Sequence, residues 1–122
     1  MKELILQPQS EIDKVRRYLE EAGYMIVKED MVFEDGKYYP VMKAELGEMH
    51  YEQEIFYEYG KLLLEKKHPV LKEFLLFKFK NYENILQKLA QDGKQEERMQ
   101  NRIQELEKEK SMIQEALQYY EM

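Results

Sequence analysis

The pattern of apolar and polar positions divides the chain into a first part with short apolar runs and a second part with long helical periodicity. Residues 3–7 form a short apolar run that Pro8 ends, which predicts a strand. A helix is expected over residues 11–22, with Ser10 as its N-cap and Gly23 at its carboxyl end. Apolar positions recur there at helical spacing and predict one buried face, made of Ile12, Val15, Tyr18, Leu19 and Ala22.

Two apolar runs and a return strand follow this helix. The runs lie at residues 24–27 and 31–33. Asp35 and Gly36 then give a strong signal for a two-residue hairpin turn. The return strand is expected over residues 37–46, where Pro40 lacks a ladder donor and therefore predicts a bulge or an unpaired position.

The remainder of the chain, from about residue 50, is predicted to be helical. A first helical piece is expected over residues 51–67, interrupted near Gly60. Pro69 suits the first turn of a second helix over residues 69–91, and a third helix is expected over residues 95–120.

The last two predicted helices carry matching heptad seams, spaced alternately by four and three residues. The seams are Leu71, Leu75, Lys78, Tyr82, Ile85 and Leu89, and then Met99, Ile103, Leu106, Lys110, Ile113 and Leu117. If the chain folds back at Gly93-Lys94, these positions pair in order, from 89 with 99 to 71 with 117. An antiparallel coiled-coil hairpin therefore satisfies both seams at once.

One layer of this predicted seam places Lys78 opposite Lys110. Two ammonium groups cannot be buried together, so both must reach the surface with their stems packed inside. The layer either fixes the register of the helices and discourages self-association, or it provides an anion contact on the arm. Both interpretations predict that leucine at the two positions stabilises the hairpin, and only the second also predicts weaker polyanion binding.

Charge is distributed unevenly along the chain. The formal net charge is −6, which taken globally argues against nucleic acid as a partner. However, residues 44–60 carry five Glu and no Lys or Arg, whereas residues 61–80 carry six Lys against two Glu. These segments form either two complementary solvated faces or a phosphate-facing surface. The chain has no Cys and no apolar run of membrane-spanning length, so we expect a cytoplasmic protein without a membrane partner.

The sequence shows no catalytic constellation of its own. Its two histidines, His50 and His68, lack a metal-ligand spacing, so no metal site is predicted. His68 precedes Pro69 at a helix start, which favours a capping or hinge role over acid–base chemistry. Several aromatic residues near lysines either stack bases or form core, namely Phe74, Phe77, Phe79 and Tyr82.

Several stretches resemble one known family. They are residues 4–8, Arg17-Tyr18-Leu19, Gly23-Tyr24, residues 34–39 and, most specifically, the YGKLLLEKKHP sequence at residues 59–69. Over most of residues 3–90 the chain looks like the late part of the bacterial tRNA (adenine(22)-N(1))-methyltransferases. The resemblance implies an α/β fold made of the last strands of a Rossmann-like methyltransferase sheet, with an antiparallel hairpin, followed by an all-α antiparallel coiled-coil hairpin.

The same resemblance implies which part of the fold binds the cofactor and which part helps to hold tRNA. In the family, S-adenosylmethionine binds near the glycine loop of the first strand, the methyl group goes to N1 of an adenine in tRNA, and the arm helps to hold the tRNA. The implied domains are residues 1–48 as the carboxy-terminal part of the methyltransferase domain, 49–67 as a helical connector and 68–122 as the arm. The catalytic residues and the cofactor loop would lie upstream, so this chain is expected neither to bind the cofactor nor to methylate alone.

Two groups of candidate site residues follow from the resemblance. Gln7, Pro8 and Gln9 stand where the family has Gln-Pro-Asn, at the carboxyl end of a strand, and would lie nearest the pocket. The tRNA contact is expected at the base of the arm, because residues 68–122 carry nine Lys and Arg against ten Asp and Glu. The expected tRNA-binding residues are Lys61, Lys66, Lys67, His68, Lys72, Lys78 and Lys80.

A non-enzymatic interaction module is the alternative function. The helical hairpin could dock a protein partner or form a dimer, because Leu76, Phe77 and Phe79 lie off the paired seam. An exposed sheet edge could also pair two copies of the chain. A stable dimer that ignores tRNA would favour this alternative.

Overall fold

The computed structural model describes residues 3–92 and 96–122, which divide into two compact units between Leu71 and Lys72. The first unit holds three strands and three short helical elements: β1 (Glu3–Leu6), α1 (Ile12–Glu21), β2 (Tyr24–Glu34), β3 (Lys37–Leu46), η1 (Phe56–Gly60) and α2 (Lys61–Glu65). The long helix α3 (Pro69–Asp92) begins in the first unit and continues into the second, which also contains α4 (Glu97–Gln118).

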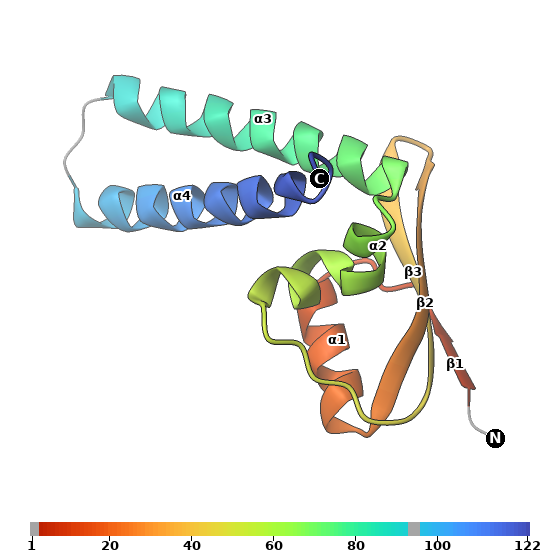
Figure 1. Ribbon diagram of the computed structural model, residues 1–122. Coiled ribbons are helices and arrows are strands. Elements are labelled where there is room, and N and C mark those ends of the chain that lie inside the picture. Colours follow the sequence, from red (N-terminus) through yellow and green to blue (C-terminus); the bar gives the residue numbers. More distant parts are fainter. Residues whose placement is uncertain (1–2, 93–95) are drawn as a thin grey trace. The chain divides into compact units, whose positions relative to one another are not determined.

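The three strands form one sheet in the order β1-β3-β2, and β3 is antiparallel to both of its neighbours. The outer strands β1 and β2 therefore run parallel to each other, and β1 ends opposite the middle of β3, where Leu6 pairs with Met42. Both residues of the predicted hairpin turn have positive φ, 52° at Asp35 and 77° at Gly36, so the prediction of this turn is confirmed. In Figure 1, α1 and α2 lie on one side of the sheet.

A single long strand, β2, contains both of the apolar runs seen in the sequence. Its pairing with β3 shifts between Ile26 and Lys28, so Val27 is the extra residue of a bulge. Bulges increase local twist, and this one changes which residues of β2 face the helices. Beyond it, Glu29 is buried on the sheet rather than exposed.

Pro40 does not lie in a bulge, because it pairs in register with Met31. It is the unpaired position that the sequence also allowed, on the side of β3 that faces β1, because β1 pairs with β3 only from Met42 onward. The missing donor of Pro40 is tolerated there.

The core of the first unit lies between α1 and the sheet. It consists of Leu19, Ile26, Met42 and Ala44, with Leu4, Leu6, Ile12, Val15, Tyr24, Met49 and Leu62 packed against it. Three predictions for this helix are wrong. Its N-cap is Glu11 rather than Ser10, Tyr18 is 65% exposed, and Ala22 is exposed as well. Arg16 shares the buried face with Leu19 instead, because its charge has a partner in the interior.

The second unit is built from α3 and α4, which run antiparallel and side by side (Figure 1). Lys110 of α4 pairs with Glu83 of α3 at 3.7 Å, and Lys72 of α3 lies 6.0 Å from the ring of Tyr120. Four residues of the predicted seams are fully buried, namely Leu71, Leu75, Leu106 and Ile113. The predicted turn at Gly93-Lys94 lies outside the described residues.

Candidate functional site

A buried ion pair lies at the centre of the first unit. Arg16 Nε of α1 donates to Glu29 Oε1 of β2 at 2.9 Å, and both side chains are at most 1% exposed. A second guanidinium nitrogen of Arg16 donates to the carbonyl oxygen of Tyr57 at 2.7 Å. Buried charges are tolerated only when they are paired and hydrogen-bonded in this way. The pair therefore ties η1 to both α1 and β2.

The carboxylate of Glu29 also holds the start of the lysine-rich segment, residues 61–80. The N–H of Leu62, in the first turn of α2, donates to Glu29 Oε2 at 3.1 Å. The interruption predicted near Gly60 is a π-helical turn, η1, that ends in Gly60 with φ 95°. A Cβ at Gly60 would lie 2.7 Å from Glu29 Oε2 and 2.8 Å from Arg16. Only glycine lets the chain pass this close to the ion pair.

Two of the candidate tRNA-binding residues have partners inside the first unit. Lys66 Nζ donates to the backbone carbonyl of Glu29 at 2.6 Å. His68 Nδ1 accepts from the N–H of Val70 at 3.2 Å, which is the capping role predicted for this histidine. His68 Nε2 lies 2.5 Å from Asp30 Oδ1, and its side chain is 14% exposed.

The carboxyl group of Asp30 is stabilised in its charged form. Burial alone would raise its pKa, but hydrogen bonds from the N–H of Met31 and from His68 outweigh that effect. The pKa of Asp30 is therefore lowered. The carboxylate of Asp30 thereby contacts His68, the residue that precedes α3.

A second polar network surrounds Tyr57 of η1. Its hydroxyl donates to Glu20 Oε2, and it also accepts from the N–H of Tyr51 at 3.1 Å. Glu20 Oε1 lies 3.1 Å from His50 Nδ1. The hydrogen bond from Tyr57 lowers the pKa of Glu20, and burial together with Glu20 raises the pKa of Tyr57. Arg17 lies 4.2 Å above the Tyr57 ring.

The candidate lysines of the second unit lie on aromatic rings or in solvent. Lys78 lies 5.3 Å from the ring of Phe74 and 5.6 Å from that of Tyr82. Lys80 is exposed. Lys78 and Lys110, which the predicted seam places opposite each other, are both half-buried. Lys110 lies 5.0 Å from the ring of Phe79. The ammonium groups are therefore stabilised at the edge of the helix pair by ring faces and by Glu83.

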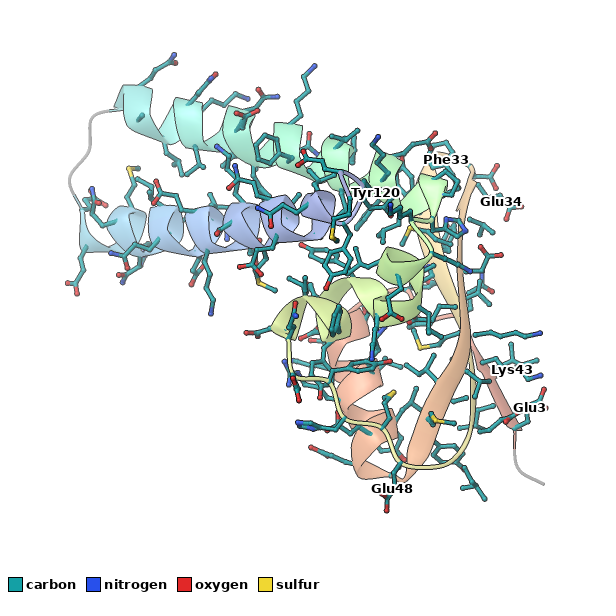
Figure 2. All side chains as sticks on the ribbon, viewed as in Figure 1. Glu3, Phe33, Glu34, Lys43, Glu48 and Tyr120 are labelled. Atoms are coloured by element: carbon teal, nitrogen blue, oxygen red, sulfur yellow. The ribbon has the colours of Figure 1, made fainter. Side chains whose placement is uncertain are left out.

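The remaining candidate residues belong to the first unit. Lys61 is the first residue of α2 and lies 5.8 Å from the ring of Phe56, and Lys67 is exposed with φ 52°. The segment Gln7–Gln9 follows β1 directly, beside the middle of β3, because Leu6 at the end of β1 pairs with Met42. At the edge of the sheet, Glu3 of β1 and Lys43 of β3 point toward each other and pair at 3.2 Å (Figure 2).

The described glycines do not form a cofactor loop of the implied kind, which needs glycines between a strand end and the start of a helix. Gly23 instead follows α1, and Gly36 forms the hairpin turn. Gly47 follows β3, where an added Cβ would lie 3.2 Å from that of Met25, and the space beside Gly60 is filled by Arg16 and Glu29. Among the residues of 3–92 and 96–122, no group of three or more potential ligands could hold a metal ion. Within these ranges, no helix is long and apolar enough to cross a membrane.

Sequence reasoning missed the Arg16–Glu29 pair. Arg16 is four residues after Ile12 and three before Leu19, so its position on the apolar face was visible in the sequence. Glu29 could not be placed, because the bulge at Val27 reverses the alternation of β2.

Comparison with solved structures places the fold in the Rossmann superfamily. A Streptococcus agalactiae protein of the NADB-Rossmann superfamily matches 95% of this chain at 28% identity and a TM-score of 0.69. The B. subtilis M1A22 tRNA methyltransferase TrmK matches 95% at 23% identity and a TM-score of 0.81. A putative tRNA (m1A22) methyltransferase from Streptococcus pneumoniae, solved with S-adenosyl-L-methionine, matches 94% at 26% identity and a TM-score of 0.76.

The family model of TrmK, tRNA (adenine(22)-N(1))-methyltransferase, matches residues 1–115. The chain therefore belongs to this family. It spans about half the length of the solved structures that it matches. It covers 48% of the S. agalactiae chain, 51% of the B. subtilis chain and 47% of the S. pneumoniae chain. No curated protein matches the sequence.

Proposed function

We propose that this chain is the carboxy-terminal part of an S-adenosylmethionine-dependent methyltransferase that modifies N1 of an adenine in tRNA. The observation that carries this proposal is the family match over residues 1–115. The sheet supports it, because two parallel strands separated by an antiparallel one suit the last three strands of such a fold. The protein would act in the cytoplasm, where tRNA is modified.

In this proposal the cofactor and the catalytic groups belong to the part of the fold that this chain does not span. The glycine positions support this division, because none of the described ones forms a cofactor cradle. Gln7–Gln9 would border the substrate pocket, since ligands of such sheets bind at the carboxyl ends of parallel strands. Gln9 would then present its amide one methylene farther out than the family's asparagine.

The helical arm, an antiparallel coiled coil in this proposal, would help to hold tRNA through phosphate contacts. Phosphate contacts supply much of the affinity for nucleic acid without reading its sequence. Lys61, Lys67, Lys72 and Lys80 suit this role best. Lys66 and His68 instead act first as structural groups, because each has a partner in the first unit.

Binding of unmodified tRNA to the full chain, measured by fluorescence anisotropy over a range of salt concentrations, tests this role. A triple variant with Lys61, Lys67 and Lys72 changed to Glu should bind at least tenfold more weakly and with a smaller salt slope, because phosphate contacts are lost. Lys66 stays unchanged so that its bond to Glu29 is preserved. Unchanged affinity and salt slope in a folded triple variant would contradict the proposed role.

A non-enzymatic interaction module is the second candidate function. Leu76 and Phe77 are 49% and 55% exposed on α3, and Ile5 is 73% exposed on the edge strand β1. Such apolar side chains suit a protein partner or a second copy of the chain. Light scattering after size-exclusion chromatography separates the candidates. A stable dimer that does not bind tRNA supports this function, and a monomer that binds tRNA supports the methyltransferase.

A further inference from the structure

The exposed surface of α3 lacks negative charge over most of its length. From Leu76 to Gln91, ten residues of this helix are classed as exposed, and none of them is acidic. The only carboxylate in this stretch is Glu83, which lies toward α4 and pairs with Lys110 at 3.7 Å. Two lysines and four side-chain amides make up the polar part of the exposed surface: Lys80, Asn81, Asn84, Gln87, Lys88 and Gln91.

These polar side chains gather on one side of the helix. At 100° per residue, Lys80, Asn84, Gln87, Lys88 and Gln91 project within an arc of roughly 100°. Lys80 and Lys88 lie about 12 Å apart along the helix axis, at a rise of 1.5 Å per residue. Two cations at this separation can contact two different phosphates, and the amides between them can bond to phosphate or sugar oxygens.

The exposed surface of α4 has the opposite character. Its acidic side chains outnumber its basic ones. Over Glu97–Gln118 the exposed charged residues are five glutamates (97, 105, 107, 109 and 115) and three cations (Arg98, Arg102 and Lys108). The half-buried Lys110 is held by Glu83 and by the ring of Phe79. A polyanion would therefore be repelled by α4 and attracted by α3.

We propose that the exposed face of α3 between Lys80 and Gln91 is an RNA-backbone contact surface, and that α4 faces away from the RNA. This inference rests on the proposed function, and it extends the contact from the base of the arm toward its distal end. Lys88 and the amide residues Asn84, Gln87 and Gln91 become binding residues in addition to the lysines inferred from the sequence. The partner is the sugar–phosphate backbone of RNA, because the surface offers cations and neutral amides in a row.

A pair of charge-matched double variants of the full chain tests the proposal. One changes Lys80 and Lys88 of α3 to Glu, and the other changes Arg98 and Lys108 of α4 to Glu. All four positions are exposed, and each double variant changes the net charge by the same amount, so general electrostatic effects cancel. Binding of unmodified tRNA is measured by anisotropy at several salt concentrations, and helix content is checked by circular dichroism.

The α3 variant should bind tRNA at least tenfold more weakly than the α4 variant, and its log–log salt slope should fall by about 1.5 to 2, as expected for two lost phosphate contacts. Changing Asn84 and Gln87 to Ala should weaken binding a few-fold with the salt slope unchanged, because amides release no counterions. Equal losses in both charge variants would overturn the proposed face while leaving the tRNA-binding function intact. If the unaltered chain does not bind tRNA at all, the proposed function fails together with this inference.

Discussion

The two units of this chain differ in where their paired charges lie: the first unit buries them, and the second keeps them at the surface of a helix pair. The first unit buries the Arg16–Glu29 pair completely and satisfies it with backbone groups of η1 and α2. The second unit keeps Lys78 and Lys110 at the edge of a helix pair, where ring faces and one carboxylate contact them. A buried pair specifies one arrangement and tolerates little change, whereas half-exposed lysines leave the helix pair adaptable. The difference predicts that substitutions within the buried pair of the first unit are severe and that substitutions of the half-exposed lysines of the second unit are mild.

The largest effect should come from breaking the buried pair. Changing Arg16 to Met leaves Glu29 charged and buried, and should cost about 3–5 kcal/mol in the free energy of unfolding. Chemical denaturation measures the loss, and hydrogen exchange should show it in α1 and β2 with α4 still protected. The neighbouring Arg17→Met is the control, because Arg17 is exposed and should cost less than about 1 kcal/mol. A loss below 1 kcal/mol at Arg16 would refute the contrast between the units.

A methyl group at Gly60 should have the next largest effect. Gly60→Ala forces a left-handed backbone and brings a Cβ within 3 Å of the ion pair, so we expect a loss of about 2–4 kcal/mol. Gly23→Ala is the matched control, since Gly23 also has positive φ (82°) but no atom near its added Cβ. It should cost only about 1–2 kcal/mol. Equal losses in thermal denaturation would show that the contact with the ion pair does not matter.

A smaller and pH-dependent loss is expected at Tyr57. Tyr57→Phe removes the hydroxyl that lowers the pKa of Glu20, and should cost about 1–2 kcal/mol at pH 7. The pKa of Glu20 is lower in the folded state than in the unfolded state. The contribution of Glu20 to the free energy of unfolding is therefore present above the pKa that Glu20 has in the unfolded state. It is lost as the pH falls through the pKa that Glu20 has in the folded state. The difference in the free energy of unfolding between wild type and Tyr57→Phe should shrink as the pH is lowered below about 4, which is near the ordinary pKa of glutamate. A difference that stays constant down to pH 2 would exclude this cause.

The smallest effect should have the opposite sign. Changing Lys78 and Lys110 together to Leu places apolar side chains in the predicted seam layer, and should stabilise the second unit by about 1 kcal/mol. The control changes the exposed residues Arg98 and Lys108 to Leu, and should lie within about 0.5 kcal/mol of wild type. Destabilisation by the Lys78 and Lys110 changes would mean that their ring and carboxylate contacts outweigh burial. Weaker tRNA binding by the same variant, relative to the control, would favour an anion-contact role for this layer.

Much of the fold could be predicted because its signals are local. The Asp35-Gly36 turn, Gly23 at the end of α1 and Pro69 at the start of α3 are each set by backbone conformations that these residues favour. The helix pair could be predicted because two heptad patterns agree with each other. By contrast, Ser10 does not cap α1, because Glu11 takes a left-handed conformation that places it at the N-cap.

The buried polar network could not be predicted, because it depends on contacts between distant segments. Arg16 and Glu29 are 13 residues apart, and Tyr57 follows Arg16 by 41. Hydrophobic periodicity assigns charged residues to the surface, so it placed Tyr18 in the core and left Arg16 outside. The same limit applies to Lys66, which the sequence suggested as a free cation but whose Nζ donates to the backbone carbonyl of Glu29 on β2.

Methyl transfer by a chimera tests the central claim most directly. The amino-terminal half of the S. pneumoniae relative would be fused to this chain and supplied with S-adenosylmethionine and unmodified tRNA. The account predicts N1-methyladenine in the digested tRNA, detected by mass spectrometry, and none when this chain is used alone. A chimera that is folded and binds the cofactor but leaves the adenines unmodified would contradict the account.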